Sequence, residues 1–248
     1  MADILPICER IAETSLFSGL GEEEKKGLFP FLASYGRLDG YRKKAIVVPG
    51  DFCIVDEGII QKIAMGPGES DKYYMHDFFV KGEFFGNECF YGDEGQMNCL
   101  CQAGLDSRVF QLDRVGELVK KSPQIAENIV NNLSEKYRRY ARKMLLIRKG
   151  YLDERLVELL WELGERAGER GRNGEVKLPL NLTDLILSRM VGSTREYVTS
   201  LTLKFREQGL MTKKKYDPGG YITLTPSFFT YAAEALDGYI KLRASHGK

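Results

Sequence analysis

The chain has 248 residues, of which 43% are apolar and 29% charged, and its formal net charge is +1. This composition is typical of a soluble globular protein with one large domain or two small ones. No run of 18 apolar residues occurs, and Asp3, Glu9 and Arg10 interrupt the pattern of a signal peptide, so we expect no membrane partner and a cytoplasmic location.

The charge is divided unevenly along the chain. Residues 1–120 contain 13 Lys and Arg against 20 Asp and Glu, whereas the remaining residues are basic. An acidic front half and a basic back half suggest two domains with different partners, and a basic domain favours a polyphosphate such as DNA. The alternative is that charge simply fluctuates along the chain.

From Leu38 to about Leu112 the sequence predicts short strands separated by turns. A short helix is expected just before them, over 21–26. Turn signals recur every 8 to 15 residues, with apolar, β-branched and aromatic stretches between them. This pattern is typical of a small all-β sandwich, roll or barrel.

At Ser122 and Pro123 the pattern changes to that of a helix, because serine is a favoured N-cap and proline a favoured first residue. No Gly or Pro follows until Gly150, which predicts a helix of roughly 28 residues. An apolar seam runs along it at spacings of three and four, formed by Val130, Leu133, Tyr137, Tyr140, Met144, Ile147 and Tyr151. The other faces carry Lys136, Arg138, Arg139, Arg142 and Lys143. We expect the seam to pack against a second copy of the chain, giving a homodimer, although it could instead cover its own β domain.

Two further amphipathic helices are predicted, over 153–168 and over 227–246, and the polar stretch 169–175 is expected to be a loop. Between them, Thr183 can cap a helix that ends at Val191, and Gly192 supplies a turn. Ser193 and Glu196 have the spacing of a capping box that opens a second helix. Two short helices joined by a turn with glycine are typical of a helix-turn-helix.

The second helix of this pair is expected to read DNA. Leu187, Ser188, Val191, Val198 and Leu201 have the spacing of packing positions, which leaves the N-terminal face of the second helix exposed. The predicted contacts are Ser193, Thr194, Arg195, Glu196, Thr199 and Ser200. Arginine can donate two hydrogen bonds to guanine and glutamate can accept one from cytosine, so Arg195 and Glu196 are the expected base-reading pair.

A hairpin beside this helix is expected to strengthen the binding of the domain to DNA. Lys213, Lys214 and Lys215 precede a turn at 217–220 and a strand over 221–225, and three lysines there suit contact with phosphates. Taken singly, a lysine run is usually a solvated surface and a capping box is common.

These segments resemble the cyclic-AMP receptor protein and FNR family of bacterial transcription regulators. The resemblance is carried by SLFSGL at 15–20, GEFFG at 82–86, GSTREYV at 192–198 and EQGL at 207–210. It implies an α+β chain with a cyclic-nucleotide-binding-like β-roll (1–120), a dimerisation helix (121–151) and a winged helix-turn-helix (152–248). It also implies RNA polymerase as a partner and Arg195 and Glu196 as base contacts. Ser200 stands where many members have a second base-reading arginine, so a different half-site is expected.

The resemblance also bears on the effector. In members that bind cyclic nucleotides, a glutamate in the Gly-Glu-x-x-Gly segment holds the ribose, and an Arg-Ser or Arg-Thr pair holds the phosphate. Glu83 matches the first requirement, but Met97 and Asn98 occupy the place of the pair, and no Lys or Arg occurs over 84–107. A buried phosphate without a cationic partner is costly, so we expect cyclic AMP not to be the effector.

Other sensing chemistries have limited support in the sequence. An FNR-type iron–sulfur cluster needs four cysteines, and of the five (Cys8, Cys53, Cys89, Cys99 and Cys101) only Cys8 lies near the N-terminus. His76 is a weak candidate for a haem ligand, and Cys99 and Cys101 could sense redox state. A β-roll metalloenzyme would need a cluster such as two histidines and a carboxylate, which one internal histidine cannot supply, so no enzyme activity and no metal site are predicted.

We therefore predict a homodimeric regulator that binds a palindromic DNA site and responds to a small molecule. The β-roll is rich in aromatic residues and poor in positive charge, which favours a neutral or aromatic effector. The candidate pocket residues are Glu83, Phe84, Phe85, Met97, Asn98, Tyr137 and Tyr140. No cofactor is predicted, with haem or thiol sensing as the alternative within the same fold.

Overall fold

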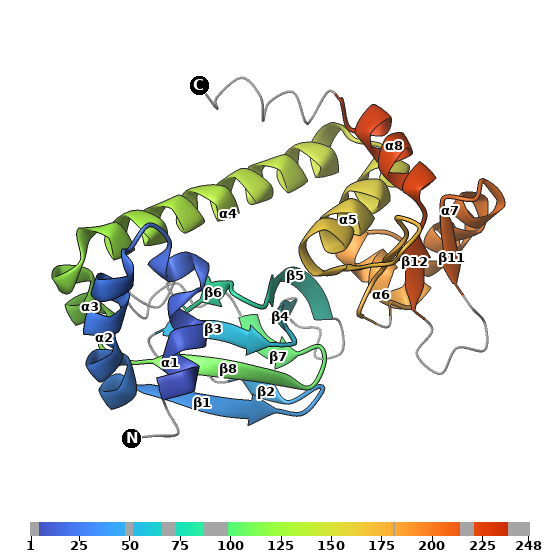
Figure 1. The fold of residues 1–248 in the computed structure, drawn as a ribbon. Coiled ribbons are helices and arrows are strands. Elements are labelled where there is room, and N and C mark those ends of the chain that lie inside the picture. The colour runs from blue at the N-terminus through green and yellow to red at the C-terminus, as the bar shows by residue number, and fades with distance from the viewer. Residues whose placement is uncertain are drawn as a thin grey trace. The chain divides into compact units, whose positions relative to one another are not determined.

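The computed structural model describes residues 5–47, 52–65, 73–86, 99–180, 182–213 and 221–237. The chain forms two compact units, Met1–Lys136 and Tyr137–Lys248, whose helices and strands are drawn in Figure 1. The division falls within one long helix, α4 (Pro123–Lys149), which begins at the predicted proline. A β-rich N-terminal part, a long helix and a C-terminal helix-turn-helix confirm the expected α+β class. The boundaries at residues 120 and 151 remain a prediction.

The first unit combines short helices with two antiparallel sheets. Its helices, besides the start of α4, are α1 (Leu5–Ala12), the 3-10 helix η1 (Ser15–Phe17), α2 (Glu22–Tyr35) and α3 (Val115–Lys121). Its strands are β1 (Gly36–Tyr41), β2 (Ile46–Val47), β3 (Phe52–Glu57), β4 (Ile59–Met65), β5 (Tyr73–Val80), β6 (Phe84–Phe85), β7 (Cys99–Ala103) and β8 (Ser107–Leu112). One sheet has the order β1-β8-β3-β6 and the other β2-β7-β4-β5.

Strand β3 is buried on both of its faces, because it lies between two hydrophobic layers. Successive side chains of a strand point to opposite sides. Cys53 and Val55 pack with Phe79 and Phe85 in the core between the two sheets. Phe52 and Ile54 point to the other face, which the helices cover. The continuous apolar pattern of this strand therefore reflects two cores.

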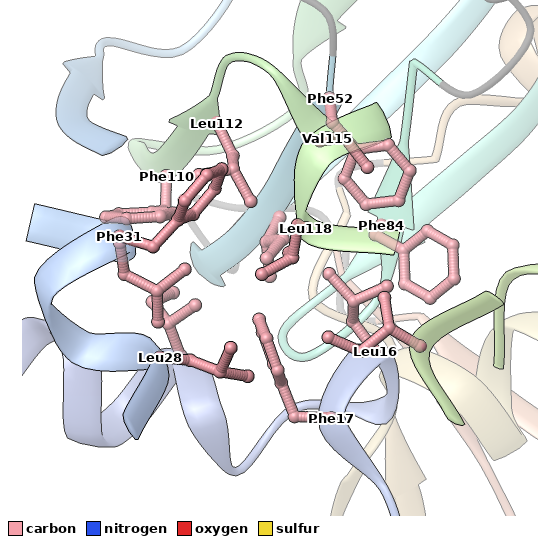
Figure 2. Close-up of a cluster of buried hydrophobic side chains, with 14 of the residues drawn as sticks. Leu16, Phe17, Leu28, Phe31, Phe52, Phe84, Phe110, Leu112, Val115 and Leu118 are labelled. Atoms are coloured by element: carbon pink, nitrogen blue, oxygen red, sulfur yellow. The ribbon is translucent and has the colours of Figure 1, made fainter. Parts of the chain in front are cut away.

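The helical layer buries the outer face of the first sheet (Figure 2). Leu16, Phe17, Leu28 and Phe31 from the N-terminal helices meet side chains from β3, β6, β8 and α3 in one cluster. The sequence analysis predicted a short helix over 21–26, whereas α2 continues through the exposed Pro30 to Tyr35, so that prediction was too short. Packing of its apolar face onto the sheet outweighs the low helix propensity of Gly27 and Pro30.

Two glycines of β1 differ sharply in their surroundings. A Cβ atom on Gly36 would lie 2.0 Å from a ring carbon of Phe110 and 2.5 Å from the carbonyl oxygen of Leu32. A Cβ atom on Gly40, on the same strand, would have no neighbour within 4 Å. Gly36 therefore allows the close approach of α2, β1 and β8, and Gly40 has no such role.

The described residues of the second unit form helices and a small antiparallel sheet. Besides the end of α4, its helices are α5 (Leu152–Ala167), α6 (Asp184–Val191), α7 (Arg195–Glu207) and α8 (Pro226–Ala235). The strands β9 (Glu169–Arg170), β10 (Val176–Lys177), β11 (Met211–Lys213) and β12 (Ile222–Leu224) form a sheet of order β11-β12-β10-β9. The stretch 169–175, expected to be a loop, thus contains a short strand paired with β10. Of the C-terminal helix predicted over 227–246, residues 238–248 lie outside the described part.

Helix α4 exposes its apolar seam. Val130, Tyr137, Met144 and Ile147 are exposed, as is Tyr151 just beyond the helix, while Leu133 and Tyr140 are half-buried. Most of the seam is therefore exposed, and its packing partner stays a prediction.

The charged side chains of α4 are not all solvated, as the sequence analysis assumed. Lys136 is only 4% exposed and points into the β-roll. Arg139, Arg142 and Lys143 pair with two carboxylates of α5 that are themselves buried, Glu158 and Glu162. The helix pattern alone could not show this, because the acidic partners lie in another element.

Candidate nucleic-acid interface

The helix-turn-helix is defined by two side-chain caps and one glycine. The hydroxyl oxygen of Thr183 accepts a hydrogen bond from the amide of Ile186 at 3.2 Å, as expected for the start of α6. Gly192 ends this helix with a φ of 68°, a left-handed conformation that glycine adopts without steric cost. Helix α7 begins three residues later, at Arg195.

The predicted capping box between Ser193 and Glu196 is wrong. The N-cap of α7 is Thr194, whose hydroxyl oxygen accepts a hydrogen bond from the amide of Tyr197 at 3.4 Å. The amide of Ser193 instead donates to the carbonyl oxygen of Ser188 at 2.9 Å and so completes the end of α6. Because this residue still belongs to the turn, the cap moves one position along the chain.

The packing between the two helices follows the sequence prediction. Leu187, Ser188 and Val191 of α6 and Val198 and Leu201 of α7 are all buried. This arrangement leaves Thr194, Arg195, Glu196 and Ser200 exposed, with Ser193 half-buried. The first two turns of α7 thus present hydroxyl, guanidinium and carboxylate groups to solvent, which are the groups that recognise base edges and phosphates.

Two of the predicted contact residues take part in interactions within the domain. The half-buried Thr199 donates its hydroxyl to Asp184 Oδ2 at 2.9 Å. The Nζ atom of Lys213 donates to the carbonyl oxygen of Leu182 at 2.9 Å and lies 3.5 Å from Asp184 Oδ1. Lys214 and Lys215 lie outside the described residues.

Three exposed apolar residues on these helices were not singled out from the sequence. Tyr197, in the first turn of α7, is 50% exposed, Leu203 of the same helix is 45% exposed, and Leu185 of α6 is 42% exposed. The helical period could have identified Tyr197 as an exposed position, because Val198 and Leu201 already form the packing face of α7.

The candidate effector residues of the β-roll are largely core residues. Phe84 stacks on Phe52 and Phe85 on Phe79, each pair with ring centroids 4.9 Å apart, and both are fully buried. The carboxylate of Glu83 accepts a hydrogen bond from the amide of Val80 at 3.2 Å. Met97 and Asn98 lie outside the described residues. Tyr137, which is exposed, and the half-buried Tyr140 belong to the other unit.

The structure places a cation in this aromatic region that the sequence analysis had assigned to an outer face of α4. The Nζ atom of Lys136 donates to the carbonyl oxygen of Phe84 at 3.3 Å. It also lies 5.0 Å from the ring centroid of Phe79 and 5.9 Å from that of Phe84, within the range of cation–π attraction. Positive charge, absent from the strands over 84–107, is therefore supplied by the helix.

The described cysteines are buried side chains. Cys8 and Cys53 are fully buried, and Cys101 is 9% exposed. Burial raises the pKa of the Cys8 thiol, which disfavours the reactive thiolate. The side chains of His76 and Cys99 are outside the described part. Within the described part, no three His, Cys, Asp or Glu residues are grouped as a metal site would require. Nor does any helix described here have the length and apolar character needed to cross a membrane.

Comparison with known proteins identifies the DNA-binding segment. Residues 154–225 match the Crp-like helix-turn-helix domain family. A sequence search against curated proteins found no match.

Solved structures share the fold over most of the chain. A CRP/FNR-family transcriptional regulator from Thermus thermophilus is 24% identical with a TM-score of 0.60, covering 81% of this chain and 98% of its own. The c-di-GMP responsive global regulator CLP of Xanthomonas campestris is 20% identical with a TM-score of 0.62, covering 81% and 99%. A cyclic nucleotide-binding domain containing protein from Listeria monocytogenes is 16% identical with a TM-score of 0.65, covering 81% and 94%. The chain thus contains a Crp-like helix-turn-helix domain and has the fold of the CRP/FNR-type DNA-binding transcription regulators.

Proposed function

We propose that this protein is a homodimeric transcription regulator that binds a palindromic DNA site and is controlled by a small molecule bound in its β-roll. The observation that carries the proposal is the exposed polar face of α7 within the Crp-like domain, formed by Thr194, Arg195, Glu196 and Ser200. A helix held by a buried partner helix, with such groups at its N-terminal end, has the form of a recognition helix.

Arg195 and Glu196 are proposed to read bases, and Lys214 and Lys215 to contact phosphates. Replacing Arg195 with alanine should cost about 1–3 kcal/mol per half-site on a duplex selected by the wild-type protein and relax the base preference. Lys214→Ala should weaken binding to all duplexes alike and lower the salt slope by about 1.8, because the proposed homodimer carries two copies of this lysine. Fluorescence anisotropy at several salt concentrations measures both quantities.

A matched control is available in Arg172→Ala. Arg172 is an exposed arginine between β9 and β10, at the opposite edge of the sheet from β11, so this variant loses the same charge away from α7. Its affinity and base preference should stay close to those of the wild type. If Arg195→Ala behaves like Arg172→Ala, the assignment of α7 as the reading helix is wrong.

The homodimer is proposed from the exposed α4 seam. Met144 is 56% exposed on the seam, and Leu145, 37% exposed, lies one position further around the helix. Met144→Glu should convert a species of twice the 28.1 kDa chain mass into a monomer, because a charge cannot be buried in an apolar contact. Leu145→Glu should leave the dimer intact. Analytical ultracentrifugation measures the mass, and a wild-type monomer at micromolar concentration would contradict the proposal.

The effector is proposed to be a neutral or aromatic small molecule other than cyclic AMP. No Lys or Arg occurs over 84–107, and the arginines of the described β-roll strands, Arg37 and Arg108, already pair with carboxylates of their own sheet. Lys136 supplies an ammonium near the rings of Phe79 and Phe84. Isothermal titration with cyclic AMP should show no binding. Micromolar binding would refute the proposal that cyclic AMP is not the effector. Native mass spectrometry of the purified protein would weigh any retained molecule, and a haem-sized excess would favour the haem alternative.

RNA polymerase is the proposed protein partner, by analogy with the family.

A further inference from the structure

The carboxylate of Asp184 connects three elements of the candidate nucleic-acid interface: α6, α7 and β11. Asp184 is the first residue of α6, and its side chain is 23% exposed. Its Oδ2 atom accepts the hydroxyl proton of Thr199 on α7, at 2.9 Å. Its Oδ1 atom lies 3.5 Å from Nζ of Lys213, the last residue of β11. Both oxygens of one carboxylate are thus used, one for the recognition helix and one for the strand that leads into the wing.

The ammonium of Lys213 is held on two sides. Besides Asp184, it contacts the carbonyl oxygen of Leu182 at 2.9 Å, and its side chain is only 23% exposed. The charge of this lysine is therefore balanced within the domain. A lysine whose charge is already balanced does not release a counterion from DNA as a free one does.

From this geometry we propose that Asp184 is a positioning residue, which fixes α7 and β11 relative to each other and keeps Lys213 from binding phosphate. The inference rests on the proposed DNA-binding function and refines it, because the three consecutive lysines then have two different roles. Lys213 is a structural contact of β11, and Lys214 and Lys215 remain as the proposed phosphate contacts. The position of β11 in turn depends on a carboxylate in α6.

The withdrawal of Lys213 is tested by the salt dependence of binding to a 30-base-pair duplex of mixed sequence. Asp184→Asn keeps an oxygen for Thr199 but releases the lysine charge in both protomers, so the slope of log affinity against log salt should steepen by about 1.8 per dimer. Between 50 and 200 mM salt, this variant should lose about twelvefold more affinity than the wild type loses. Lys213→Met in the wild-type background should change the slope by less than about 0.6, and in the Asp184→Asn background it should restore the wild-type slope.

Two results would overturn this part of the inference. One is an unchanged slope for Asp184→Asn. The other is a loss of about 1.8 in slope for Lys213→Met alone, which would make Lys213 an ordinary phosphate contact in both protomers. Lys214→Met is the matched comparison, with an expected loss of about 1.8 in either background. An unchanged slope for Lys214→Met would refute the proposed phosphate contact of Lys214 and would leave the role of Asp184 unaffected.

The positioning role is tested through Thr199. Thr199→Val removes the hydroxyl and keeps the shape, so it should lower the preference for a selected duplex over the mixed one severalfold without changing the salt slope. Thr199→Ser keeps the hydroxyl and should restore the preference. Equal preference in the valine and wild-type proteins, or an equal loss in the serine and valine proteins, would refute a role for this hydrogen bond.

A measurement without DNA separates this inference from the proposed function. If Asp184 and Lys213 interact, the Tm shifts of Asp184→Asn and Lys213→Met should sum to more than the shift of the double variant. A wild-type protein that binds neither duplex would refute the proposed function while leaving this coupling measurable. Additive Tm shifts would refute the Asp184–Lys213 contact itself.

Discussion

Replacing Glu162 with glutamine is expected to destabilise the second unit by about 3 kcal/mol. The carboxylate of Glu162 is 3% exposed and faces three cations: Arg166 at 2.7 Å, Lys143 at 3.1 Å and Arg139 at 3.6 Å. The side chains of these cations are 14%, 27% and 12% exposed, respectively. Glutamine has the same shape but no charge, so it leaves mostly buried positive charge without its balance.

The magnitude follows from the cost of breaking a buried ion pair, about 3–5 kcal/mol. The lower end applies here for two reasons. Lys143 keeps some contact with water, and the amide oxygen of glutamine can still accept a hydrogen bond from Arg166. Glu165→Gln is the matched control on the same helix, because Glu165 is 42% exposed and pairs with Arg170, which is 69% exposed. An exposed pair contributes about 0–1 kcal/mol, so this variant should be close to the wild type.

Urea unfolding followed by tryptophan fluorescence measures both variants. Trp161 is the one tryptophan of the chain and lies on α5, with the guanidinium carbon of Arg142 5.5 Å from its ring centroid. Its signal therefore follows the second unit. The free energies are compared by linear extrapolation, provided that the m-values agree. A loss below about 1 kcal/mol for Glu162→Gln, or equal losses for the two variants, would refute the reasoning.

Three further predictions concern the fold and the turn before α7. Gly36→Ala should lower the free energy of unfolding by about 1–3 kcal/mol, because its Cβ would overlap the phenylalanine ring of β8. Gly40→Ala should change this free energy by less than about 1 kcal/mol, and urea titrations measure both variants. Thr194→Ala should cost about 1 kcal/mol through loss of the α7 cap, while Ser193→Ala should be nearly neutral, and the reverse order in thermal melts would restore the sequence-based cap. Burial raises the pKa of the Cys8 thiol above its ordinary value of 9.0, so above that pH the unfolded chain loses the thiol proton before the folded chain does. The free energy of unfolding in urea titrations should therefore fall as the pH rises above 9.0, and it should fall less steeply in Cys8→Ala.

Features that depend on neighbouring residues were predictable from the sequence. The start of α4 at Pro123, the cap at Thr183 and the left-handed Gly192 depend on the conformational preferences of single residues. The packing positions of the helix-turn-helix depend on the helical period, which is also local. These features correctly predicted which residues of α7 are buried and the order of the main elements. The match of residues 154–225 to the Crp-like helix-turn-helix domain family agrees with them.

Two predictions were wrong, the cap of α7 and the length of α2, because the local sequence is compatible with more than one conformation at each place. Ser193 and Thr194 can both cap a helix, and the choice depends on how α6 ends, since the amide of Ser193 is used by Ser188. Helix α2 continues past Pro30 because its apolar residues pack on a sheet formed by later parts of the chain. In the first case a hydrogen bond at the end of α6 decides the cap, and in the second case packing on the sheet decides the length of the helix.

The sequence by itself determined the helix-turn-helix, the apolar seam of α4 and the alternation of strands and turns in the β-roll. Only the tertiary structure decided which charges are buried. Lys136 meets Phe84, 52 residues away, and Lys213 meets Leu182, 31 residues away, although both lysines looked like surface residues in the sequence. The physical reason is that capping and periodicity act within one or two turns of chain. The partner of a buried charge, by contrast, is chosen by the packing of elements far apart in sequence.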